Sequence, residues 1–120
     1  MREQPTGAEL LAIAREVLRK ELLPLLPKDR QYDALMIANA MGIAQRQLEV
    51  GERPAQAELV ELGALLGEAG DLAALNRRFA QGIRAGHFDS SIATRDLLWR
   101  MTLQRVRESA PRALAASGIV

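Results

Sequence analysis

The stretch Tyr32–Leu48, YDALMIANAMGIAQRQL, constrains the fold more than any other part of the chain. Between Ala34 and Ala44 it contains a single strongly polar residue, Asn39. On a helix with about 100° per residue, its apolar side chains fall on two roughly opposite sides. A helix that is apolar on both sides needs neighbours on both sides, so the sequence predicts a central helix. One predicted stripe contains Tyr32, Leu35, Met36, Asn39, Gly42, Ile43 and Arg46, and the other contains Ile37, Met41, Ala44 and Leu48.

The composition indicates an all-α protein. Hydrophobic residues make up 48% of the chain but aromatic residues only 3%, so Leu, Ala, Ile, Val and Met must build the core. A chain of 120 residues is long enough to bury such a core as one domain. We therefore expect a compact bundle of about five helices. Residues 1–120 would form a single domain, with residues 1–6 and 112–120 as loose termini.

Capping residues and helix breakers predict where the helices begin and end. Thr6 and Glu9 have the spacing of a capping box. Pro24 and Pro27 remove two amide donors and favour a turn, after which Asp29 is the expected N-cap of the central helix. These signals, with the glycines further along, predict helices over about 7–23, 30–50, 55–66, 71–85 and 91–109.

Several classes of site are excluded by composition. The chain has no Cys and its single His is His87, so disulfides, thiolate metal sites and multi-His metal sites cannot form. No run approaches the roughly 18 apolar residues of a membrane span, and the N-terminus has no apolar core of a signal peptide. We expect a cytoplasmic protein with no metal, no cofactor and no membrane partner.

Charge is distributed unevenly along the chain. Residues 1–76 carry 8 Lys or Arg against 12 Asp or Glu, whereas residues 77–120 carry 8 Arg against 3 acidic residues. The basic end lacks Lys clusters and interleaved aromatic residues, which nucleic-acid-binding surfaces use to follow phosphates and stack on bases. We therefore expect no nucleic-acid partner.

Four polar or small residues on two predicted helices form a candidate polar groove: Asn39, Gly42, Arg46 and Asn76. An amide in an apolar helix is costly unless it is hydrogen-bonded. Asn39 would either satisfy a buried backbone group at the end of another helix or face a ligand or partner. Arg46 leans toward Gly42, which offers no side chain to obstruct it. Its guanidinium would form an internal ion pair, or it would serve an interface or an anion site.

The helix predicted at 91–109 has apolar residues around more than half of its circumference, which is too wide for one buried face. Arginines alternate with these residues, and that combination is enriched at the centres of protein interfaces. A candidate interface therefore comprises Trp99, Arg100, Met101 and Arg105. Trp99 is equally compatible with a place in the core.

No catalytic constellation is evident, because the chain contains no Gly-rich phosphate loop, no nucleophile elbow and no pair of candidate carboxylates. His87 can act as a general base in principle, with Arg84 and Asp89 nearby in sequence. A lone His in a loop is more often a surface residue. The sequence therefore favours a non-catalytic role.

Two segments resemble the signature of a known family. They are residues 38–49, ANAMGIAQRQLE, and the downstream pair LNRRF at 75–79 and IRAGHFD at 83–89. The chain resembles a family of small bacterial all-helical proteins classed as a domain of unknown function, over nearly its whole length. The resemblance implies a protein that accompanies an aminoglycoside-phosphotransferase-like kinase and an acyl-CoA dehydrogenase.

The function implied by this resemblance is that of a non-catalytic accessory subunit of the kinase, which would act on hydroxyacyl-CoA in hydroxy-acid breakdown. Two alternatives remain open. The chain would be a stand-alone homo-oligomeric scaffold, or a small CoA-ester-binding protein that uses Arg84, His87 and Asp89. Neither the acyl-chain preference nor the surface that contacts the kinase follows from the sequence.

Overall fold

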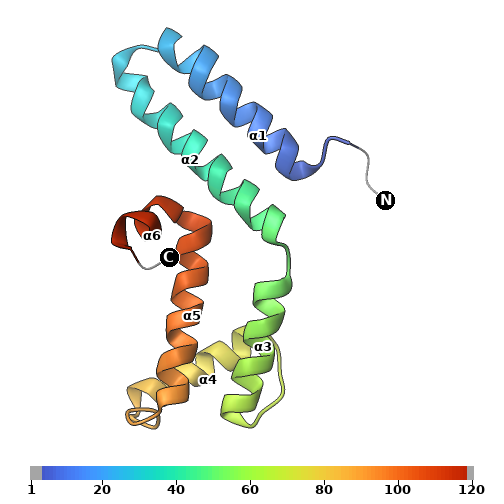
Figure 1. Cartoon of the computed structure of the whole chain (residues 1–120), viewed down its shortest axis with the longest axis vertical. Helices are drawn as coiled ribbons and strands as arrows, with labels where there is room; N and C mark the ends of the chain where they lie inside the picture. Colours follow the sequence, from blue (N-terminus) through green and yellow to red (C-terminus); the bar gives the residue numbers. More distant parts are fainter. Residues whose placement is uncertain (1–3, 119–120) are drawn as a thin grey trace. The chain divides into compact units, whose positions relative to one another are not determined.

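The computed structural model describes residues 4–118, and every regular element in that range is a helix. The all-α prediction is confirmed, with six α-helices in the described residues in place of about five (Figure 1). They are α1 (Gly7–Val17), α2 (Lys28–Val50), α3 (Arg53–Leu66), α4 (Leu72–Arg84), α5 (Ile92–Ser109) and α6 (Pro111–Ser117). A π-helical turn (Leu18–Leu22) and a 3₁₀ turn (Leu23–Leu25) follow α1.

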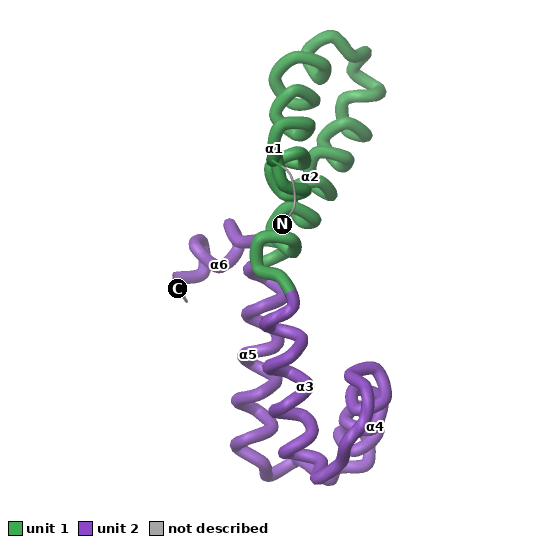
Figure 2. The backbone as a smooth tube through the Cα atoms, turned by 90° about the vertical axis from the view of Figure 1, so that its right-hand side faces the viewer, with its two compact units in different colours: residues 1–51, 108–110 green, residues 52–107, 111–120 purple. Residues whose placement is uncertain are grey.

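The chain divides into two compact units (Figure 2). Unit 1 comprises residues 1–51 with 108–110, and unit 2 comprises residues 52–107 with 111–120. Unit 1 is built on the antiparallel hairpin of α1 and α2, and unit 2 on α3, α4 and most of α5.

The helix ends of unit 1 agree in part with the sequence signals. Thr6 and Glu9 form the predicted capping box, because the Thr6 side chain accepts from Glu9 N–H and the Glu9 carboxylate accepts from Thr6 N–H. The predicted N-cap Asp29 is wrong: α2 is capped by Pro27, whose carbonyl accepts from Arg30 N–H at 2.9 Å. Asp29 lies in the first turn instead, where a negative charge favours the helix dipole.

The face that α2 buries consists of small residues, not of the large apolar residues expected there. Ala34, Ala38 and Gly42 are buried, four residues apart, on one stripe of α2. Leu35 and Met36, which belong to a predicted stripe, are 43% and 44% exposed. Small side chains allow two helix backbones to approach closely, whereas large ones are displaced to the flanks of the contact. The central helix therefore keeps much of its large apolar surface uncovered.

The large apolar residues of α1 also divide between a covered and an exposed side. Leu11 and Leu18 are half-buried, whereas Leu10, Ile13 and Val17 are 54%, 56% and 40% exposed. Leu10, Ile13 and Val17 have the spacing of one helical stripe, and we call them the α1 stripe. Tyr32, Met36 and Asn39 are likewise exposed at helical spacing, and we call them the α2 stripe.

Asn39 is exposed, so the expectation that it satisfies a buried backbone group is wrong. Its amide reaches solvent because α2 turns its small residues, not this stripe, toward α1. Replacing Asn39 with Leu should therefore change the free energy of unfolding by no more than about 0.5 kcal/mol, the usual range for surface substitutions. Chemical denaturation of the parent and of Asn39→Leu measures this difference, and a loss above 1 kcal/mol or so would show a structural role.

Unit 2 has a core of Leu62, Leu75, Phe79 and Leu97, contributed by α3, α4 and α5. The predicted start of α4 at about residue 71 is confirmed, and Asp71 is its N-cap, since the Asp71 carboxylate accepts from Ala74 N–H at 2.7 Å. This core is what holds the three helices of unit 2 together.

The segment after Pro111 differs from the loose tail that the sequence suggested. Pro111 is the first residue of α6, a position where its fixed backbone angle favours a helix. Leu114 is buried, which ties this short helix down. Residues 1–3 and 119–120, which belong to the predicted loose termini, lie outside the described residues.

Candidate functional site

The structure brings two members of the predicted polar groove together and adds a third residue, Arg15. Arg15 Nε donates to the carbonyl of Ala38 at 3.0 Å, across the contact between α1 and α2. Arg46 Nε donates to the carbonyl of Glu108 at 2.5 Å, within the same unit. A Cβ atom at Gly42 would lie 3.2 Å from Arg15 Nε and 3.4 Å from Arg46 Nη1. Both guanidinium groups therefore rest against the backbone that Gly42 leaves bare.

Asn76 belongs to unit 2, whereas Arg15, Gly42 and Arg46 belong to unit 1. It lies on α4 in unit 2, where its amide donates to Glu58 Oε1 at 3.2 Å and to the Leu72 carbonyl at 3.1 Å. The Leu72 contact is within the helix, and the Glu58 contact joins α4 to α3. Asn76 therefore has a structural role in unit 2.

The candidate interface residues of α5 lie in different environments. Trp99 is 52% exposed, whereas Met101 packs against the core of unit 2. Arg100 donates to the Glu61 carboxylate at 2.9 Å, and Arg105 lies 3.9 Å from that of Glu58. Part of the wide α5 surface thus faces α3, whereas Ile92, Leu98 and Trp99 stay exposed to solvent.

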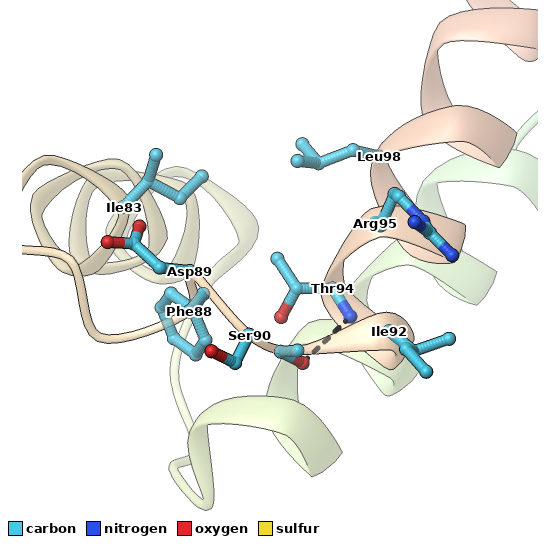
Figure 3. A pocket seen from close by; sticks show the side chains of 9 residues that line it. Ile83, Phe88, Asp89, Ser90, Ile92, Thr94, Arg95 and Leu98 are labelled. Atoms are coloured by element: carbon cyan, nitrogen blue, oxygen red, sulfur yellow. Dashed lines mark hydrogen bonds between the residues drawn. The ribbon is translucent and has the colours of Figure 1, made fainter.

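A pocket of about 420 Å³ lies between the end of α4, the following loop and the start of α5 (Figure 3). Its wall combines apolar and polar side chains, which suits an amphipathic small molecule. Among the weak candidates, Asp89 lines it, whereas Arg84 and His87 are exposed outside its wall. The lining residues are Ile83, Phe88, Asp89, Ser90, Ser91, Ile92, Thr94, Arg95 and Leu98.

The polar wall of the pocket is shaped by the first turn of α5. Ser91 Oγ accepts from Thr94 N–H at 3.1 Å, which satisfies one of the free amides at the helix start (Figure 3). The Thr94 hydroxyl is buried and has no hydrogen-bond partner among residues 4–118. A buried hydroxyl without a protein partner is unusual, since most buried polar atoms are hydrogen-bonded to protein or to water.

The apolar wall depends on close packing around Gly82. Phe88 packs edge-to-face on Phe79 with 5.5 Å between ring centroids. A Cβ atom at Gly82 would lie 2.5 Å from Phe88 Cε2, so only glycine allows the ring to occupy this place. Gly82 is therefore a packing requirement of the pocket wall.

Replacing Gly82 with Ala should lower the free energy of unfolding by about 1–3 kcal/mol, because the added methyl group displaces the Phe88 ring from the core. Thermal or chemical denaturation measures the loss. Ala80→Gly on the same helix is the control for helix propensity. At position 82, helix propensity favours alanine over glycine and therefore opposes the expected loss of stability. An unchanged or higher stability of Gly82→Ala would contradict this packing account.

Other classes of site are not evident in the described chain. Residues 4–118 contain no group of three His, Asp or Glu side chains placed to hold a metal ion. Within the same range, no helix combines the length and hydrophobicity that crossing a membrane requires.

Comparison with known families identifies the chain. A model described as a domain of unknown function, DUF6285, matches residues 24–113, which include α2 to α5 in full. The chain belongs to this family. No curated protein and no solved structure matches it. The DUF6285 segment contains Gly42, Arg46, the α2 stripe and the pocket, whereas Arg15 and the α1 stripe precede it.

Proposed function

We propose that this DUF6285 protein is a non-catalytic accessory subunit that binds an aminoglycoside-phosphotransferase-like kinase through the α1 and α2 stripes. The observation that carries the proposal is the exposure of Leu10, Ile13 and Val17 on a helix whose other side already packs on α2. A helix with apolar residues on both sides is stable when both sides are covered. Large exposed apolar patches mark binding surfaces in soluble proteins.

A partner that covers the α1 and α2 stripes would bury large apolar side chains. Burying one such side chain fully contributes about 1.5–3 kcal/mol. Each residue of the α1 stripe is at least 40% exposed, and so are Tyr32 and Met36 of the α2 stripe. A partner that covers these side chains would gain a fraction of the burial free energy of each one. Only the part of this gain that exceeds the cost of association would appear as affinity.

The choice of a kinase as the partner rests on the resemblance of residues 38–49 and 75–89 to proteins that accompany such kinases. Residues 38–49 lie on α2 and include Asn39 of the α2 stripe. The kinase would act on hydroxyacyl-CoA in the cytoplasm, and the accessory chain would stabilise or position it without contributing a catalytic residue.

Co-expression with an aminoglycoside-phosphotransferase-like kinase from the same organism tests this proposal. The parent chain should co-purify with the kinase, and Ile13→Glu or Met36→Glu should weaken the complex at least tenfold, because each places a charge in an apolar contact. Gln56→Glu adds the same charge at an exposed position of α3 and should bind like the parent. Equal binding by all three variants, with their helical content intact, would contradict the proposal.

The homo-oligomeric scaffold is tested with the same variants in the absence of the kinase. Light scattering of the parent chain gives its molecular mass in solution. A dimer or larger assembly that Ile13→Glu dissociates would assign the stripes to contacts between copies of this chain. A monomer that binds the kinase supports the accessory role.

A second candidate function is the binding of a CoA ester, which the pocket at the start of α5 favours. The pocket offers apolar side chains for an acyl group and Arg95 for an anionic group. Isothermal calorimetry with a hydroxyacyl-CoA should show binding that Arg95→Gln weakens, and Arg77→Gln on the exposed surface of α4 is the matched control. Absence of binding by the parent excludes this function.

A further inference from the structure

We infer that Arg15 and Arg46 form a phosphate-binding site over Gly42 in unit 1. The inference goes beyond the proposed function, because the site needs no kinase and lies at the contact between α1 and α2 and not on the exposed stripes. Its basis is the placement of two guanidinium groups against one bare point of the α2 backbone.

Hydrogen bonds fix the orientation of both guanidinium groups. Arg15 uses Nε to bind the Ala38 carbonyl, and Arg46 uses Nε to bind the Glu108 carbonyl. Both partners are backbone carbonyls, which carry partial negative charge but no formal charge. Because Nε is the donor in each case, the terminal Nη groups, which carry most of the hydrogen-bonding capacity of an arginine, remain for a ligand.

Neither arginine has a carboxylate in ion-pair contact within residues 4–118. The ion pairs of unit 1 are formed by other residues, Lys20 with Glu16 and Arg30 with Asp33. Arg15 and Arg46 are both half-buried, so solvent screens their mutual repulsion less than it does for exposed side chains. Two close cations without a counterion favour the binding of an anion.

Glycine at position 42 leaves room for this convergence. A methyl group there would lie 3.2 Å from Arg15 Nε, which is tighter than an ordinary contact, and 3.4 Å from Arg46 Nη1, so the Arg15 guanidinium would have to move by a few tenths of an ångström. Gly42 is buried in the middle of α2, where glycine lowers helix stability relative to alanine by about 1 kcal/mol. The chain thus keeps an unfavourable residue at the one place where both guanidinium groups meet the helix.

The chemical class of the ligand follows from the charge and geometry of two arginines. Each guanidinium presents paired N–H donors that match two oxygens of a phosphate or carboxylate. A carboxylate neutralises one positive charge, whereas a phosphate or phosphate monoester carries nearly two negative charges near neutral pH. The phosphoryl dianion therefore fits the site best, either as free phosphate or as part of a phosphorylated small molecule.

Isothermal calorimetry on the full chain tests the inference, with inorganic phosphate titrated in chloride buffer at constant ionic strength. The parent should bind phosphate saturably. Arg15→Gln and Arg46→Gln should each weaken binding at least tenfold, whereas Arg19→Gln, an exposed position on the turn after α1, should bind like the parent. Adenosine 5′-monophosphate and adenosine distinguish the sources: tighter binding of the monophosphate than of phosphate indicates a phosphorylated small molecule.

Gly42→Ala keeps the test informative even where an arginine variant loses structure. Alanine favours the helix, so circular dichroism should show helical content equal to that of the parent, while phosphate affinity falls at least tenfold. Phosphate affinity equal to that of the parent in Gly42→Ala and in both arginine variants would overturn the inference. Absence of saturable binding by the parent at millimolar phosphate would overturn it as well. Neither result bears on kinase binding, which the stripe variants measure.

Discussion

Leu62→Ala should lower the free energy of unfolding by about 2–5 kcal/mol, the range for removing a large aliphatic side chain from a packed core. Leu62 is 0% exposed and contacts a core that includes Leu75, Phe79 and Leu97. Truncation to alanine leaves a cavity that three different helices border, so the surrounding structure cannot close it by moving one side chain. Chemical denaturation followed by circular dichroism measures the loss.

Leu59→Ala is the matched control, because Leu59 lies one turn earlier on α3 and is 36% exposed. The same change of side chain there removes less buried surface and should cost clearly less than Leu62→Ala. Equal losses at the two positions would contradict the assignment of Leu62 to the centre of the core in unit 2.

Ala38→Leu should lower the free energy of unfolding by about 1–3 kcal/mol, because α1 and α2 meet at this position. Ala38 is 2% exposed, and its carbonyl accepts the hydrogen bond from Arg15. A leucine side chain does not fit between the helices unless they move apart, which would also disrupt the Arg15 contact. Thermal denaturation measures the effect.

Ala40→Leu on the same helix provides the control for Ala38→Leu, since Ala40 is exposed and the two substitutions have the same helix propensity. It should change stability by less than about 0.5 kcal/mol. If Ala38→Leu lowered the free energy of unfolding no more than Ala40→Leu does, the assignment of a close small-residue contact between α1 and α2 would be wrong.

The helices and several of their ends could be predicted because local chemistry determines them. The capping box of Thr6 and Glu9 and the Asp71 cap depend on residues three positions apart, and both are present. Gly67 ends α3 in the left-handed conformation, as its place after an apolar run predicts. The start of α2 could not be predicted from side-chain capping, because the N-cap residue Pro27 supplies a backbone carbonyl and no side-chain acceptor.

The direction in which each helix faces could not be predicted from hydrophobicity. Apolar patterning identifies which residues avoid water but not which neighbour covers them. On α2, Ala34 and Ala38 make the close contact and Met36 remains exposed, because helix separation depends on side-chain size and not on hydrophobicity alone. A pattern that is apolar on both sides is compatible with either arrangement.

The candidate site was predicted in part. Gly42 and Arg46 do meet, but Arg15 was not singled out, although it lies between Leu11 and Leu18 on the half-buried side of α1. The sequence does contain a signal for Arg15, which is a charged residue at helical spacing within an apolar stripe. Asn76 could not be separated from the groove by sequence, because its partner Glu58 is distant in the chain.

The most direct test of the central claim is the oxidation of Met36 in the presence and absence of the kinase. Met36 belongs to the α2 stripe and is 44% exposed, so peroxide should convert it to the sulfoxide readily in the free chain. Met101, which packs against the core of unit 2, is the internal reference. If the kinase covers the stripe, the oxidation of Met36 should slow severalfold while that of Met101 is unchanged. A complex in which Met36 is oxidised as fast as in the free chain would contradict the claim.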